Sequence, residues 1–207
     1  MLRASLIVVL RPLLWLLFGL SVGGREHLPR QGPAIVAANH NSHVDILFLL
    51  CAFPLRAGRK VVPMGAADYF LATPLLRFVA LRILGLLPLE RRVRRGADPL
   101  EGSRRALEEG RILIVFPEGT RGQPEEMGEL KSGLTKLARD ASAPIIPVYL
   151  QGAGRILPKG ARLPVPFLCT MLVAPPIHPQ RDRAAMMADL SNAYGALREA
   201  APPLHWS

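Results

Sequence analysis

The stretch AIVAANHNSHVDILFLLCAF, residues 34–53, decides the fold of this 207-residue chain. It opens with Ala34–Ala38, an unbroken run of small and apolar residues that is typical of a strand buried on both faces. A polar loop follows, and the stretch ends in the apolar segment Ile46–Phe53, which we expect to be a helix. A strand, a polar loop and a helix in this order indicate an α/β sheet, whose ligand loops lie at the carboxyl ends of the strands.

The same alternation of strands and helices continues toward the carboxyl terminus. Glycine, proline and charged residues concentrate between the apolar segments, so residues 117–130 and 151–166 are expected to be surface loops. The chain is therefore predicted to be an α/β domain with a mixed, mostly parallel sheet covered by helices. Further strands are predicted at residues 60–63, 86–89, 112–116, 145–149 and 167–174, and further helices between residues 98 and 110, over 131–141 and over 181–200.

The composition excludes several classes of protein. Half of the residues are hydrophobic, only 20% are charged, and the mean hydropathy is +0.23, which argues against a disordered chain. No internal repeat is visible, so solenoids and propellers are not expected. The two cysteines, Cys51 and Cys169, lie far apart in apolar runs and are expected to be buried, inert thiols of a reducing compartment.

The formal net charge of +10 arises from 26 Lys and Arg against 16 Asp and Glu. Such an excess favours nucleic acid, anionic lipid or a phosphorylated small molecule as a partner. Nucleic-acid proteins usually combine their basic patches with aromatic residues that stack on bases. The densest basic run here, Glu90–Arg95, contains no aromatic residue. We therefore expect no nucleic-acid partner, and favour a membrane surface with anionic lipids or a phosphate ligand.

The amino-terminal stretch Leu2–Val22 is the most apolar part of the chain, and its only charges are Arg3 and Arg11. It could be a secretory signal with a cleavage site near Ser21, a membrane-spanning helix, a segment within one leaflet, or a core helix. Because Arg11 and Pro12 split the apolar run into two short pieces, we predict a monotopic anchor hinged at Pro12. Residues 1–24 are thus expected to anchor the domain formed by residues 25–207.

The loop after the first strand carries a candidate general base. Ser42 and Asp45 have the spacing of a capping box, so Ser42 is the expected N-cap of the helix. His40 then lies in the loop, where its Nδ1–H can meet the Asp45 carboxylate and leave Nε2 free to take a proton. Alternatively, Asp45 only caps the helix and His40 is an ordinary loop residue. His43, at the helix start, is expected to have a capping or surface role.

A second polar constellation follows the strand that ends at Phe116. Arg121 offers a planar fork for a phosphate group, and Glu118 can orient that guanidinium or accept a hydrogen bond from a hydroxyl. Arg91 occupies the corresponding position after the predicted strand at residues 86–89, and Lys131 adds positive charge. The alternative for Arg91 is a place in a solvated or lipid-facing basic run with its neighbours.

Together these segments resemble the glycerolipid acyltransferase family typified by 1-acyl-sn-glycerol-3-phosphate acyltransferase. The family has four ordered blocks, and each has a counterpart in this sequence, together with a Lys-x-Gly turn after the third. The matching segments are Asn39–Asp45 for NHxSxxD, Gly85–Arg91 for the Gly…Arg block, Phe116–Arg121 for FPEGTR, Ile146–Val148 for the apolar-Pro-apolar block, and Lys131–Gly133 for the turn.

The resemblance implies transfer of a fatty acyl group from acyl-CoA or acyl-carrier protein to the sn-2 hydroxyl of 1-acyl-glycerol-3-phosphate, which yields phosphatidic acid. His40 would be the base and Asp45 its partner, with no metal and no cofactor besides the acyl donor. Because the donors are cytosolic, the site is expected on the cytoplasmic face of the cell membrane. The alternatives are acylation of another lyso-lipid, or a non-catalytic protein that binds anionic membranes. The residues implied to bind the acceptor are Arg91, Glu118, Gly119, Thr120, Arg121 and Lys131.

Overall fold

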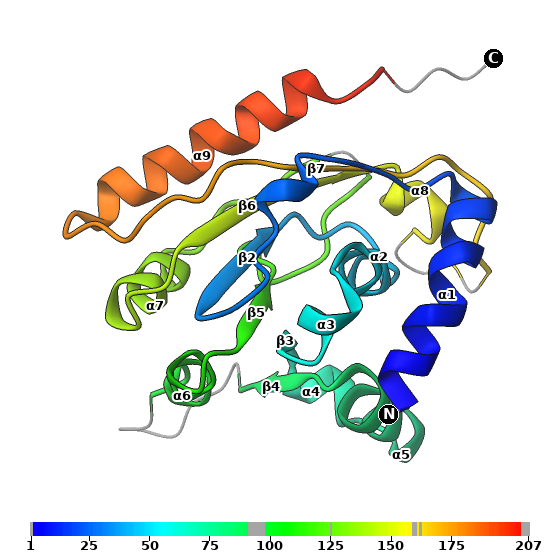
Figure 1. Cartoon of the computed structure of the whole chain (residues 1–207), viewed down its shortest axis with the longest axis horizontal. Coiled ribbons are helices and arrows are strands. Elements are labelled where there is room, and N and C mark those ends of the chain that lie inside the picture. The colour runs from blue at the N-terminus through cyan, green and yellow to red at the C-terminus, as the bar shows by residue number, and fades with distance from the viewer. Residues whose placement is uncertain (1, 91–97, 125, 159–160, 162, 204–207) are drawn as a thin grey trace.

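A computed structural model describes residues 2–90, 98–124, 126–158, 161 and 163–203. Within these residues, seven strands form one sheet in the order β1-β7-β6-β2-β5-β3-β4 (Figure 1). Neighbouring strands are parallel except β6 and β7, which are antiparallel. The prediction of a mixed, mostly parallel sheet covered by helices is confirmed. The strands are β1 (Ser21–Gly23), β2 (Ala34–Ala38), β3 (Val61–Ala66), β4 (Leu87–Leu89), β5 (Ile112–Val115), β6 (Ile145–Gln151) and β7 (Thr170–Val173).

Helices cover both faces of the sheet, so the molecule has three layers (Figure 1). All five residues of β2 are buried: Val36 packs toward α1, α2 and α3, whereas Ile35 and Ala37 pack toward α6, α7 and α9. This double burial explains the unbroken apolar run of the β2 sequence. The helices and helical turns are α1 (Leu2–Phe18), η1 (Arg25–His27), α2 (Asp45–Ala52), α3 (Leu55–Gly58), α4 (Ala67–Phe70), α5 (Pro74–Phe78), the π-helical η2 (Val79–Leu84), α6 (Glu101–Glu108), α7 (Gly133–Asp140), α8 (Ala153–Ile156) and α9 (Arg183–Ala200).

The amino-terminal segment is one continuous helix, α1, so the expected hinge at Pro12 is wrong. Ile7 and Leu14, which flank Pro12, are both buried in the core beside α2, and this packing keeps the helix axis continuous. In the described part of the chain, no helix is long and apolar enough to cross a membrane. Residues Ser21–Gly23, which the sequence analysis places in the anchoring segment, form β1 and pair with β7.

Two arginines bind the carboxyl end of α2. The Nε of Arg11 donates to the carbonyl oxygen of Cys51 at 2.9 Å, and its Nη2 donates to the carbonyl of Phe53. Arg25 donates to the carbonyl of Ala52 at 2.9 Å. The last carbonyls of a helix lack partners within the helix and carry the negative end of its dipole, so two cations stabilise this end. Arg11 of α1 therefore ties the amino-terminal helix to α2.

Both cysteines are buried, as predicted, and neither forms a disulfide. Burial raises the pKa of the Cys51 thiol to about 11. Burial also raises the pKa of Cys169. Both side chains therefore remain protonated thiols at neutral pH and act as small apolar groups of the core.

Gly152, directly after β6, has a φ of +84°, and a Cβ at this position would overlap the carbonyl oxygen of Leu168. We expect Gly152→Ala to lower the free energy of unfolding by about 3 kcal/mol, since strain and overlap add. Gly195→Ala is the matched control: no atom lies within 4 Å of its Cβ position in α9, and alanine favours helix by about 0.5–1 kcal/mol. Urea denaturation compares the two variants, and equal stabilities would contradict the expectation.

Candidate active site

His40 and Asp45 form a hydrogen-bonded pair at the carboxyl end of β2. The Nδ1 of His40 lies 2.9 Å from the Oδ2 of Asp45, and the Asp45 side chain is almost fully buried. The imidazole also stacks on the ring of Phe116, with centroids 4.0 Å apart. These contacts fix the ring plane and leave Nε2 directed to the adjacent pocket, where His40 is a lining residue. The contact between His40 and Asp45 has the geometry expected from the sequence.

The Asp45 carboxylate also organises the loop that carries His40. Its Oδ2 accepts hydrogen bonds from the backbone N–H groups of Asn41 and Ser42, each at 2.8 Å. The predicted N-cap role of Ser42 is wrong, because α2 begins at Asp45 and Val44 precedes it. The loop amides turn toward the carboxylate instead, and the hydroxyl of Ser42 donates to the carbonyl of Leu157 at 2.9 Å. Asp45 thus both caps the loop amides and holds the imidazole.

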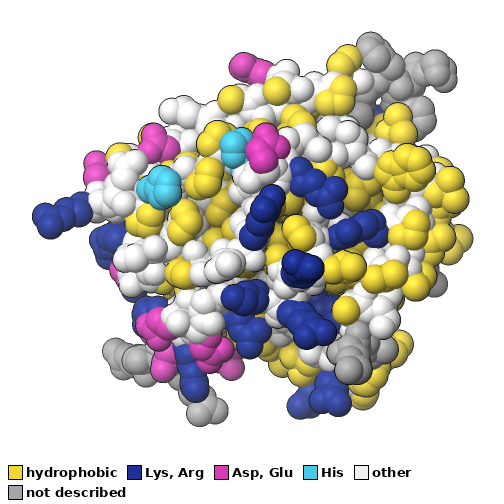
Figure 2. Space-filling model, in the orientation of Figure 1, with side chains coloured by type: hydrophobic (Ala, Val, Ile, Leu, Met, Phe, Trp, Pro, Cys, Tyr) yellow, Lys and Arg dark blue, Asp and Glu magenta, His cyan; other side chains and the backbone are white. Residues whose placement is uncertain are grey.

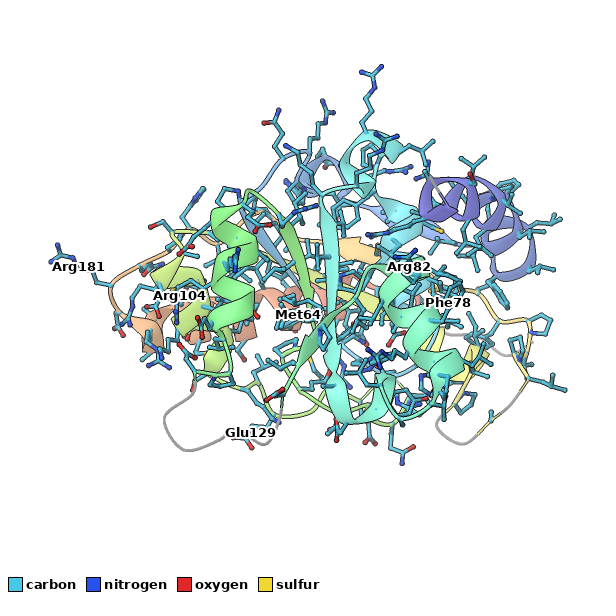
Figure 3. All side chains as sticks on the ribbon, turned by 90° about the horizontal axis from the view of Figure 1, so that it is seen from below. Met64, Phe78, Arg82, Arg104, Glu129 and Arg181 are labelled. Carbon is cyan, nitrogen blue, oxygen red and sulfur yellow. The ribbon has the colours of Figure 1, made fainter. Side chains whose placement is uncertain are left out.

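A cavity of about 310 Å³ opens beside His40. Both polar and apolar side chains line it, and the apolar ones include the buried Met64 near the middle of the molecule (Figure 3). The cavity can therefore hold a ligand with a polar group and an apolar chain. The polar lining comprises His40, His43, Tyr69, Thr120 and Arg121, and the apolar lining includes Ile46, Met64, Phe70, Leu84, Leu89, Val115 and Phe116.

The turn after β5 brings three of the predicted binding residues, Gly119, Thr120 and Arg121, to this cavity. Gly119 has a φ of +71°, a left-handed conformation that favours glycine and lets the chain reverse at the sheet edge. The side chain of Lys131 lies against Gly119, since a Cβ there would be 2.6 Å from its Nζ. Arg91 lies outside the described residues.

Glu118 has a different place from the one expected. It is buried and neither orients Arg121 nor lines the cavity; its Oε1 accepts from the backbone N–H of His40 at 2.8 Å, and its Oε2 accepts from that of Gly128 at 2.7 Å. Burial raises the pKa of Glu118, and the two backbone hydrogen bonds oppose this shift. The short turn after β5 places the side chain against the backbone of the histidine loop and not in the cavity. Glu118 therefore stabilises the backbone position of His40.

We expect Glu118→Gln to lower the free energy of unfolding by about 2 kcal/mol, because one amide N–H₂ must replace an acceptor that faces a backbone N–H. Turnover should fall as well, since the backbone of His40 loses its support. Thermal denaturation measures the first effect, and the rate of the acyl transfer that the sequence resemblance implies measures the second. Glu129→Gln, in an exposed loop position (Figure 3), is the control and should change neither value appreciably. A Glu118→Gln variant with wild-type stability would show that the two amides do not need the carboxylate.

Comparison with known proteins places this geometry in a family. The profile of the family described as Acyltransferase matches residues 19–151, which include the histidine loop, the turn after β5 and strand β6. The chain belongs to the acyltransferase family. Within it, the chain is 30% identical over 146 residues to the Arabidopsis thaliana protein "1-acyl-sn-glycerol-3-phosphate acyltransferase LPAT1, chloroplastic", covering 70% of this chain and 39% of that protein.

Two further relatives of this acyltransferase-family chain are informative. A Mycoplasma pneumoniae protein named "Probable 1-acyl-sn-glycerol-3-phosphate acyltransferase" is 33% identical over 129 residues, covering 62% of this chain and 47% of that protein. The chain thus spans less than half the length of these two relatives. The crystal structure of the 1-acyl-sn-glycerophosphate (LPA) acyltransferase PlsC from Thermotoga maritima superposes with a TM-score of 0.73 and 23% identity, covering 99% of this chain and 81% of that one. This likeness shows a shared fold.

Sequence reasoning missed several residues of the acyltransferase site. His43, expected at a helix cap or on the surface, lines the cavity together with Tyr69, because α2 begins two residues later and leaves His43 in the loop. Asn39 ties the loop to β6: its Oδ1 accepts from the N–H of Leu150 at 2.7 Å and its Nδ2 donates to the same residue's carbonyl at 2.9 Å. The position of Asn39 directly after a fully apolar strand is the sequence signal that could have identified it as a residue of the site.

Proposed function

We propose that this acyltransferase-family protein transfers a fatty acyl group from an acyl-CoA or acyl-carrier-protein thioester to the sn-2 hydroxyl of 1-acyl-glycerol-3-phosphate, forming phosphatidic acid. The observation that carries the proposal is the His40–Asp45 pair beside a cavity that both polar and apolar side chains line. A lyso-lipid likewise combines a polar headgroup with an apolar chain. The names of the relatives support the same acceptor.

In the proposed reaction, Nε2 of His40 takes the proton of the sn-2 hydroxyl while the oxygen attacks the thioester carbonyl carbon. The new C–O bond forms, the C–S bond breaks, and the leaving thiolate receives the proton from the imidazolium. Asp45 stabilises the imidazolium between these transfers, because its carboxylate is fixed 2.9 Å from Nδ1. The reaction passes through no acyl-enzyme and draws on no metal or further cofactor. Arg121 would bind the acceptor phosphate, with Thr120 and Lys131 near it. For Arg91, which lies outside the described residues, a part in acceptor binding rests on the sequence resemblance alone.

The decisive experiment is a screen of donors and acceptors with the purified protein and a radiolabelled acyl group. Acyl-CoA and acyl-carrier protein are each combined with 1-acyl-glycerol-3-phosphate, lysophosphatidylcholine, lysophosphatidylethanolamine and a lyso-aminolipid. We expect the phosphate monoester to give the highest kcat/KM. Equal use of the four acceptors would overturn the proposed acceptor, and membrane binding without acyl transfer from any donor would indicate a non-catalytic protein.

We also propose that α1 anchors the protein in one leaflet, on the cytoplasmic face where thioester donors are available. The exposed side of α1 is apolar, and the exposed Leu168 lies against Gly19, directly after the end of α1. Figure 2 shows hydrophobic side chains gathered on the right of the molecule, beside a group of Lys and Arg that suits anionic headgroups. The apolar surface of α1 comprises Val8, Val9, Leu13, Trp15, Leu16 and Leu17.

Replacing Trp15, Leu16 and Leu17 together by Gln should lower the partition coefficient onto phosphatidylglycerol-containing vesicles at least about a hundredfold, since each side chain contributes about 1–2 kcal/mol of apolar burial. Vesicle flotation measures the partition coefficient. All three side chains are more than half exposed, so the melting temperature should stay within a few degrees of wild type. Unchanged partitioning would contradict the anchor.

A further inference from the structure

Arg121, His43 and Tyr69 contact one another at the cavity, although they come from three separate segments. Arg121 donates from Nη1 to Nε2 of His43. The hydroxyl of Tyr69 lies 3.2 Å from the same Nε2, and the rings of Tyr69 and His43 stack with centroids 5.5 Å apart. The guanidinium carbon of Arg121 lies 5.8 Å from the centre of the Tyr69 ring.

The chemistry of these groups fixes their roles in the cluster. A guanidinium has only donors, so its contact with Nε2 requires a lone pair on that nitrogen and a hydrogen on Nδ1 of His43. The Tyr69 hydroxyl then also donates to Nε2. Two donors from different segments therefore converge on one acceptor in the cavity wall.

The local charges agree with a neutral His43. Burial, with smaller contributions from Arg121 and His40, lowers the pKa of His43, and the charge of Asp45 only partly opposes this shift. A neutral imidazole is a weaker acceptor than an anionic phosphate oxygen, which forms short, charge-assisted hydrogen bonds with arginine. A phosphate that enters the cavity can therefore take over both donors.

We propose that Tyr69 binds the acceptor phosphate together with Arg121, and that His43 is a positioning residue that keeps both donors aimed at the phosphate position. This inference rests on the proposed function and names further determinants of its acceptor specificity. The stack of His43 on Tyr69 fixes the tyrosine ring, and Nε2 fixes the direction of the guanidinium. Selection of a phosphate monoester then depends on Tyr69 and His43 in addition to Arg121 of the Phe116–Arg121 block.

The test measures kcat and KM for 1-acyl-glycerol-3-phosphate and, as substrate or competitive inhibitor, for the phosphate-free 1-acyl-glycerol. Tyr69→Phe removes only the hydroxyl, and His43→Phe keeps a stacking ring but removes the acceptor. Tyr69→Phe should raise KM for the phosphate acceptor about tenfold, the loss of one charge-assisted hydrogen bond. His43→Phe should raise this KM by a similar factor, because Arg121 and Tyr69 lose the contact that aims them at the phosphate position. In both variants kcat should fall less than about threefold. His43→Gln restores an acceptor oxygen and should recover part of the affinity. His178→Phe, at an exposed histidine outside the cavity lining, is the control.

The KM for 1-acyl-glycerol should change less than about twofold in every variant. An equal rise in KM for both lipids would show a general packing role and overturn the inference. An unchanged KM for the phosphate acceptor in His43→Phe and Tyr69→Phe, with wild-type preference for phosphate retained, would overturn the inference alone. A wild-type protein with no preference for the phosphate acceptor would overturn the proposed function itself.

Discussion

His40→Ala should lower the acyl-transfer rate at least about a thousandfold, because the variant lacks the imidazole nitrogen Nε2 that takes the proton of the attacking hydroxyl. In the wild type, Asp45 at 2.9 Å and the ring of Phe116 hold this imidazole in place. The measurement is the single-turnover rate at saturating donor and acceptor, which separates chemistry from binding.

The control for this loss is His178→Ala, since His178 is exposed and lies outside the cavity lining. It should retain the wild-type rate within about twofold. Vesicle binding of His40→Ala should equal that of wild type, because His40 lines the cavity and is not one of the exposed apolar side chains of α1. A His40→Ala variant with near-normal turnover would contradict the general-base role.

Asp45→Asn should reduce turnover about a thousandfold, since an amide cannot stabilise the imidazolium as a carboxylate does. The substitution also weakens the loop, because Oδ2 of Asp45 accepts three hydrogen bonds, from His40, Asn41 and Ser42. The free energy of unfolding should therefore fall by about 1–3 kcal/mol. Rates are measured at temperatures well below the melting point of the variant, so that the catalytic loss is separated from unfolding.

Asp140→Asn offers a comparison, because Asp140 is a partly exposed carboxylate at the end of α7 that pairs only with its neighbour Arg139 among the described ion pairs. This variant should retain wild-type turnover and stability. If Asp45→Asn loses stability but keeps its rate per folded molecule, Asp45 is a cap of the loop and not a partner in catalysis.

The central strands were predictable because their sequences are dictated by burial on both faces. The bounds of β2 match the prediction residue for residue, and β5 and β6 differ only at their ends. By contrast, β1 has three residues and depends on pairing with β7, about 150 positions away. The local sequence therefore has no pattern that predicts this strand. The turn α8 lies in a segment expected to be a loop, since its four residues are too few to show helical periodicity.

The site was predictable where adjacent residues make the contacts. His40 and Asp45 are five positions apart, and the loop between them allows few arrangements. The place of Glu118 was not predictable, because its partners are backbone amides of His40 and Gly128 and such contacts leave no sequence pattern. The cluster of His43 with Arg121 depends on the start of α2, which differs from the expected start by only two residues.

The arginine contacts at the carboxyl end of α2 bear on how a detergent-free form of the protein should be designed. Truncation before β1 would remove Arg11 and leave the carbonyls of Cys51 and Phe53 without this donor. The same helix begins with Asp45, so fraying at one end would loosen the orientation of the catalytic pair at the other. If α1 binds the membrane as proposed, polar replacement of its exposed apolar side chains, with Arg11 retained, is therefore a better way to release the protein from the membrane than deletion of the helix.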